Sequence, residues 1–128
     1  MTDLVLDAGG VSRLARRSQD AAAMITVFSR DGNWPPVVPS VVLVECTSGR
    51  PRHDTVINRF LKICDITEEI PEHIARRAGS LRATAGRGSA VDALVVALAE
   101  PGGTVLSSDL VDLRALAAHA DDVKVVRA

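Results

Sequence analysis

Short apolar runs alternate with longer helix-like stretches along the whole chain. The runs are only a few residues long and mostly aliphatic, and the stretches between them mostly have the length and the alanine or leucine content of helices. We expect five strands at these runs: Leu4–Leu6, Val37–Val38, Ile63–Ile66, Thr104–Leu106 and Val123–Val126. This order predicts the α/β class, with a central parallel sheet of about four or five short strands flanked by helices.

Glycine and proline clusters are expected to separate these strands and helices. They occur at Gly9-Gly10, residues 32–36 and Pro101–Gly103, and Gly86–Ser89 separates two expected helices. No repeat or long polar linker interrupts the chain, so residues 1–128 are predicted to form a single domain. The sequence is 47% hydrophobic but only 2% aromatic. Its core must therefore consist mainly of Val, Leu, Ile and Ala.

The sequence favours neither a secreted nor a membrane protein. Its first ten residues lack the basic start and long apolar run of a secretory signal, and the run Ala93–Ala99 is too short to span a bilayer. We therefore expect a cytoplasmic protein with no membrane partner. Cys46 and Cys64 could form a disulfide by number alone, but a reducing compartment favours two buried thiols.

Four carboxylates stand in otherwise apolar surroundings. Each lies at or beside an apolar run and has no Lys or Arg next to it in the sequence: Asp7, Glu45, Asp92 and Asp109. Burying an ionised carboxylate without a partner costs several kcal/mol or shifts its pKa, so four of them call for a shared counter-charge. Magnesium and manganese prefer such hard oxygen ligands. A divalent cation is the simplest candidate.

The expected topology can bring these acids to one edge. Ligands of an open parallel sheet gather outside the carboxyl ends of its strands. Asp7 and Asp109 follow the first and fourth expected strands, Glu45 falls early in the helix after the second, and Asp92 lies in the first turn of a helix that begins at Ser89. We therefore expect the four side chains to meet at this edge.

Each acid also has a purely structural interpretation. Asp7 and Asp109 could cap the helices that follow them, with Asp112 as a favourable first-turn charge. Ser89 and Asp92 have the spacing of a capping box. Glu45 could face solvent from its helix. The residues alone leave these alternatives open.

The arrangement of the four acids resembles that of the PIN-domain ribonucleases, and among them the VapC-type toxins of bacterial type II toxin–antitoxin systems. Four segments in the same order carry the resemblance: residues 4–8, 39–45, 89–99 and 105–113. Two positions depart from the family pattern. Ala8 follows the first Asp where the family often has Thr or Ser, and Ser107 stands where the family frequently has Thr, which keeps a hydroxyl.

The resemblance implies a PIN-like fold and metal-dependent endonucleolytic cleavage of RNA by an activated water. Asp7 and Asp92 would hold Mg²⁺ or Mn²⁺ most directly, and Glu45 and Asp109 would be further ligands. Asp112 would give outer support and Ser107 a supporting hydroxyl. The family also implies a homodimer and a cognate antitoxin whose tail covers the acidic site. His53, His73 and His119 have no context that suggests a shared site, and we expect them at the surface or at helix ends.

Arginines are the candidate RNA-binding residues. The net charge is −1, but with four acids neutralised by metal the 15 basic residues face 12 remaining acidic ones, and 13 of the 15 are arginine. One Trp, two Phe and no Tyr cannot build a base-stacking platform, so phosphate contacts must dominate. The candidate RNA-binding residues are Arg13, Arg16, Arg17, Arg50 and Arg87. A GC-rich genome and an ordinary solvated surface are the alternative explanations.

Two other functions fit the pattern less well. A catalytically inactive PIN-like binding module would be favoured if an essential acid were missing, and none is. A phospho-acceptor receiver domain is also a parallel α/β fold with acids at its edge. It requires paired N-terminal acids and a lysine after its last acidic strand, and Lys62 and Lys124 are not placed there.

Overall fold

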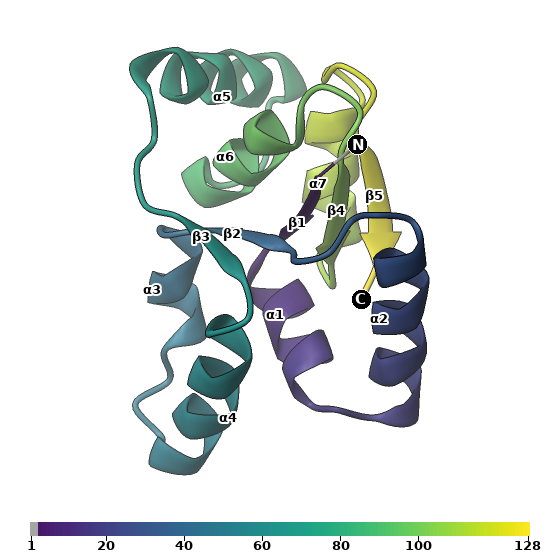
Figure 1. Ribbon diagram of the computed structural model, residues 1–128. Coiled ribbons are helices and arrows are strands. Elements are labelled where there is room, and N and C mark those ends of the chain that lie inside the picture. Colours follow the sequence, from purple (N-terminus) through teal and green to yellow (C-terminus); the bar gives the residue numbers. More distant parts are fainter. Residues whose placement is uncertain (1–2) are drawn as a thin grey trace.

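A five-stranded parallel sheet forms the centre of the computed structural model, which describes residues 3–128 (Figure 1). Its strands are β1 (Leu4–Leu6), β2 (Val37–Pro39), β3 (Asp65–Thr67), β4 (Thr104–Ser107) and β5 (Lys124–Arg127). Their order across the sheet is β3-β2-β1-β4-β5, and every neighbouring pair is parallel. The predicted fold class is confirmed.

This strand order also separates the fold from that of a receiver domain. Receiver domains have the order 2-1-3-4-5, in which the first strand lies between the second and the third. Here β1 lies between β2 and β4. The receiver-domain alternative is therefore contradicted.

One strand prediction was displaced along the chain. Ile63 and Cys64 were expected in the third strand, but β3 begins at Asp65. The backbone N–H groups of Ile63 and Cys64 donate to the carbonyls of Phe60 and Leu61, which continues the preceding helix as a turn. Ile63 is 53% exposed. The apolar content of the sequence does not reveal that these N–H groups are hydrogen-bonded within a turn, and for that reason the strand was predicted to begin too early.

Seven helices surround the sheet in the described part of the chain. They are α1 (Ala8–Ala15), α2 (Gln19–Arg30), α3 (Val42–Cys46), α4 (Pro51–Leu61), α5 (Glu72–Ala85), α6 (Ala90–Ala99) and α7 (Leu110–Ala117). Helices α5, α6 and α7 pack on one another, while α1 packs against α2, α3 and α4 (Figure 1). Within residues 3–128, no helix has the length and apolar character that crossing a membrane requires.

The core is aliphatic, as the composition predicted. All three residues of β1 are fully buried, as are Val105 and Leu106 of β4. Helix α6 covers them with a face that includes Val95 and Val96. Both cysteines are free, but Cys46 is buried and Cys64 only half-buried. The prediction of two buried thiols therefore holds in full for Cys46 alone.

Gly9 and Gly10 are helical and do not break the chain, contrary to the expectation that they punctuate it. Both lie in the first turn of α1. A side chain at Gly9 would clash with the Ser108 side chain, and one at Gly10 would clash with the Leu106 carbonyl. The two glycines therefore let the start of α1 approach the connection between β4 and α7.

Candidate metal centre

Asp7 links the first strand, the first helix and β4. It is the N-cap of α1, and its Oδ1 accepts a hydrogen bond from the backbone N–H of Gly10 at 2.9 Å. Its Oδ2 accepts a hydrogen bond from the hydroxyl of Ser107, the last residue of β4. The capping interpretation of Asp7 is therefore confirmed, but capping occupies only one of its two oxygens.

The environment of Asp7 opposes its ionisation. Burial raises the pKa of its carboxyl group above the ordinary value, because the side chain is only 7% exposed. The hydrogen bonds from Ser107 and Gly10 act in the opposite direction, and the charges of Asp92 and Asp109 raise the pKa further. The charges of Asp92 and Asp109, which are far from Asp7 in the sequence, therefore act on it in the folded protein.

Asp92 is fixed by the start of α6. Its Oδ2 accepts a hydrogen bond from the N–H of Ser89 at 3.1 Å, and its own N–H donates to the Ser89 hydroxyl at 3.0 Å. The predicted capping box is confirmed. The capping box uses only Oδ2 of Asp92, and Oδ1 has no hydrogen bond in the described part of the structure. The cap therefore holds a carboxylate in place and leaves an oxygen available as a ligand.

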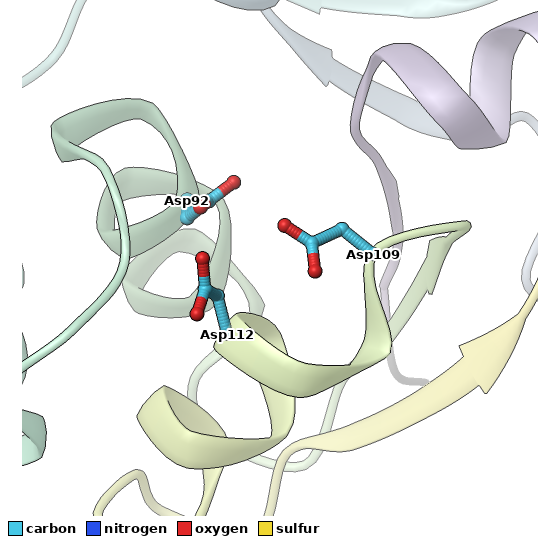
Figure 2. A group of neighbouring side chains, drawn as sticks. All are labelled: Asp92, Asp109 and Asp112. Carbon is cyan, nitrogen blue, oxygen red and sulfur yellow. The ribbon is translucent and has the colours of Figure 1, made fainter.

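Asp109 stands at the N-cap position of α7 but does not cap it through its side chain. The backbone N–H of Asp109 instead donates a hydrogen bond to the Ser107 hydroxyl at 2.9 Å. The carboxylate of Asp109 is exposed and turned toward Asp92 (Figure 2). The side-chain capping interpretation is wrong for this residue.

Asp112 completes a close group of three carboxylates. One oxygen each from Asp92, Asp109 and Asp112 lies within 4.8 Å of the other two. Figure 2 shows the three side chains converging from α6 and α7. The Nε of Arg87 also donates to Oδ1 of Asp112 at 2.7 Å. Among residues 3–128, these three acids form the only group of at least three His, Cys, Asp or Glu side chains with this spacing.

Glu45 belongs to the wider group but not to the close trio. It is the fourth residue of the short helix α3 and is exposed to solvent. Its pKa is raised, first by partial burial and then by the charges of Asp92 and Asp7. The charge of Asp92 therefore reaches both Asp7 and Glu45, and Asp109 lies close to Asp92. Asp112, expected only as outer support, joins Asp92 and Asp109 in the close trio.

The donor set fits a hard divalent cation. It offers carboxylate oxygens from the three residues of the trio, and the buried Asp7 and the exposed Glu45 both lie within reach of the charge of Asp92. Magnesium binds oxygen ligands and keeps several of its waters, so few protein ligands suffice. The structure places none of the three histidines in this group. His53 lies beside Asp54 on α4, and His73 and His119 are exposed.

The predicted RNA-binding arginines do not share one location. Arg13 and Arg16 line a hollow of about 170 Å³ together with Ser12 and Ser108, next to Asp109 in the sequence. Arg17 follows α1 and does not line this hollow, and Arg50 lines a different one. Arg87 lies at the acidic trio itself.

Arg13 has unused hydrogen-bonding capacity in this hollow. Its ion pair with the exposed Asp20 is 3.5 Å long, and its buried Nε has no hydrogen-bond partner. Buried donors are normally paired, so the guanidinium group of Arg13 is not held by a full set of hydrogen bonds within the described part of the protein. Arg77, in contrast, is already used: it donates two hydrogen bonds to Glu100.

The sequence did not predict the ion pair between Arg87 and Asp112. It spans 25 residues, and proximity along the chain shows no basic partner for any of the acids. The available signal was the motif Gly86-Arg87-Gly88, in which a charged residue stands between two residues suited to left-handed backbone.

No protein-family model matches the sequence, and no curated protein sequence matches it. Solved structures do match the fold. The crystal structure of DNA-bound VapBC from Salmonella typhimurium aligns with a TM-score of 0.72 at 13% identity, over 99% of this chain and 98% of that chain. PAE2754 from Pyrobaculum aerophilum aligns with a TM-score of 0.66 at 14% identity, over 98% of this chain and 91% of that chain. The chain therefore has the PIN-like fold predicted from its sequence.

Proposed function

We propose that this protein is a metal-dependent endoribonuclease and the toxin of a toxin–antitoxin pair. The observation that carries the proposal is the convergence of Asp92, Asp109 and Asp112 at the acidic edge of a PIN-like fold, with one oxygen of each within 4.8 Å of the others. Hydrolysis of a phosphodiester at neutral pH requires an activated water and a counter-charge for the phosphate. A divalent cation held by carboxylates provides both.

Each acid has its own role in this mechanism. Asp92 and Asp109 would hold the cation, and Asp112 would join them or orient a water beside it. Asp7 adds negative charge from a buried position, and Ser107 fixes its orientation. Glu45 is exposed and within reach of the charges of Asp92 and Asp7, and it would accept a proton from the attacking water. A bound Mg²⁺ or Mn²⁺ lowers the pKa of that water and offsets charge on the phosphate.

The protein binds RNA mainly through contacts between arginine side chains and RNA phosphates. Arg13 and Arg16 form the basic side of a hollow that also contains Ser108, the residue before Asp109. An RNA strand whose phosphate enters this hollow therefore passes close to the acidic trio. Electrostatic contacts of this kind bind without reading sequence, so they give affinity and register but no base preference.

A protein partner is proposed to cover the acidic edge. One structural neighbour is a VapBC complex, and that supports an antitoxin partner for this chain. Two large apolar side chains lie open beside the acids: Val44, next to Glu45, is 79% exposed, and Val111, between Asp109 and Asp112, is 63% exposed. Apolar groups at such a site are suited to burial under a partner. We propose a homodimer only because the family resemblance implies one.

Cleavage of an end-labelled RNA by the purified protein tests the proposed activity. Wild type should cleave with Mg²⁺ or Mn²⁺ and stop in EDTA, and Asp7→Asn and Asp92→Asn should each lose cleavage while remaining folded. Arg76→Gln is the matched control, because Arg76 pairs with Glu72 on the exposed face of α5. Near-wild-type cleavage by Asp92→Asn would remove that residue from the site. RNA binding without cleavage by wild type would indicate an inactive binding module instead.

A further inference from the structure

The loop between α5 and α6 holds its central arginine in a defined place. Gly86 and Gly88, on either side of Arg87, have φ angles of +69° and +95°. A side chain at Gly88 would press on Leu116 of α7 at 2.8 Å. The carbonyl of Gly88 also accepts a hydrogen bond from the Nε of Arg82 at 2.9 Å. The Gly88 side of the loop is therefore tied to α5 and α7, so the position of Arg87 does not depend on its ion pair alone.

The contact of Arg87 with the trio uses only part of its guanidinium group. Its Nε donates to Oδ1 of Asp112 at 2.7 Å, and its side chain is 54% exposed against 29% for Asp112. One oxygen of Asp112 at the same time lies within 4.8 Å of oxygens of Asp92 and Asp109. With all three acids ionised the trio carries three negative charges, and Arg87 reduces the local total to two. Asp7 and Glu45 lie within reach of the charge of Asp92, so the group keeps an excess of negative charge that suits a divalent cation even with Arg87 present.

We propose that Arg87 is a fixed counter-cation of the metal centre. It orients Asp112 and offsets one carboxylate, so that the site holds one divalent ion and holds it less tightly than the bare trio would. The inference rests on the proposed function, since it assumes that the trio binds a cation. It assigns Arg87 a positioning role at the metal in place of the RNA-phosphate contact expected from the sequence.

Two opposing effects of Arg87 decide the expected direction. Orienting Asp112 favours metal binding, but ion pairs exposed to this extent contribute little. Repulsion between a guanidinium and a doubly charged ion disfavours metal binding, and it scales with the product of the two charges. Removing Arg87 should therefore tighten metal binding overall.

Mn²⁺ binding to the full chain, measured by the electron paramagnetic resonance of free Mn²⁺, tests this inference. Wild type should bind one ion per chain. Arg87→Gln should bind it about tenfold more tightly, equivalent to about 1.4 kcal/mol. Arg87→Lys keeps the charge and should stay within about twofold of wild type. Arg76→Gln removes the same charge from an exposed pair on α5 and should leave the affinity unchanged.

Melting temperatures separate this role from a merely structural one. In EDTA, Arg87→Gln should melt below wild type because the three acids lose their counter-charge, and on adding Mn²⁺ it should gain more than wild type. Equal or weaker Mn²⁺ binding by Arg87→Gln, or Arg87→Lys behaving like Arg87→Gln, would overturn the inference while leaving the metal centre standing. If wild type bound no Mn²⁺, the proposed metal centre itself would fail, and this inference with it.

Discussion

The hydroxyl of Ser107 at the end of β4 donates a hydrogen bond to the carboxylate of Asp7 at the end of the adjacent strand β1. The same Ser107 oxygen accepts the backbone N–H of Asp109. One buried side chain therefore joins two acids that are 102 positions apart in the sequence. Ser107 is fully buried, and its contact with Asp7 is buried as well. We regard this residue as the link that ties the first acid to the rest of the site.

Removing the Ser107 hydroxyl should destabilise the protein. Ser107→Ala leaves an oxygen of Asp7 and the N–H of Asp109 without their partner, and such losses cost about 1–3 kcal/mol. Ser107→Thr keeps the hydroxyl and should lose less. Urea unfolding in EDTA measures both variants. A Ser107→Ala protein as stable as wild type would show that water or a rearranged side chain satisfies Asp7.

The stability of the metal-free protein should depend on pH through Asp7. Burial raises the pKa of its carboxyl group in the folded state, so the folded state favours the protonated form. Its stabilising contribution is therefore fully present below the unfolded-state pKa and is lost as the pH rises through the folded-state pKa. Asparagine carries no charge and still serves as an N-cap.

We accordingly expect Asp7→Asn to be more stable than wild type in EDTA at neutral pH. The difference should shrink as the pH is lowered and vanish below the ordinary aspartate pKa of about 4. Denaturant unfolding at a series of pH values measures it. A difference that stays constant across the series, or one that favours wild type at neutral pH, would contradict the assigned direction of the pKa shift.

Strand and helix order could be predicted because it depends on local apolar runs. The first, second and fourth expected strands lie within β1, β2 and β4, and the capping box at Ser89 was recognisable from its spacing alone. The start of β3 was misplaced, because the turn after α4 is decided by backbone hydrogen bonds that hydrophobicity does not report.

The candidate site was only partly predictable for a related reason. Strand order determines which acids share an edge, and a parallel α/β pattern places Asp7 and Asp109 there. Distances within the group depend on tertiary packing. Asp112 lies in the close trio because the first turn of α7 faces α6, and Arg87 reaches it from the loop before α6. The closeness of Asp112 has no local sequence signal, and the signal for Arg87 is limited to its position between two glycines.

Arg13 and Arg16 should contribute more to RNA binding than Arg17. The first two line the hollow beside Ser108, and Arg17 does not. The double variant Arg13→Gln/Arg16→Gln should weaken RNA binding and flatten its dependence on salt, because each lost phosphate contact reduces the slope of log affinity against log salt by about one. Arg17→Gln serves as the matched control.

Fluorescence anisotropy at several salt concentrations, in EDTA to prevent cleavage, measures these affinities on the isolated protein. Equal losses for Arg17→Gln and for each single variant would show that the helix contributes only general positive charge. An unchanged slope in the double variant would place the RNA on another face.

The central claim is that the acidic edge binds a divalent cation and uses it to cleave RNA. The most direct measurement is a Mn²⁺ titration of the EDTA-stripped protein in which bound ion and the initial rate of RNA cleavage are followed in the same samples. We expect both to rise along one curve, and we expect Asp92→Asn to lose both, because that residue supplies a free carboxylate oxygen to the trio. Cleavage that persists without bound ion, or ion binding by Asp92→Asn equal to that of wild type, would contradict the account.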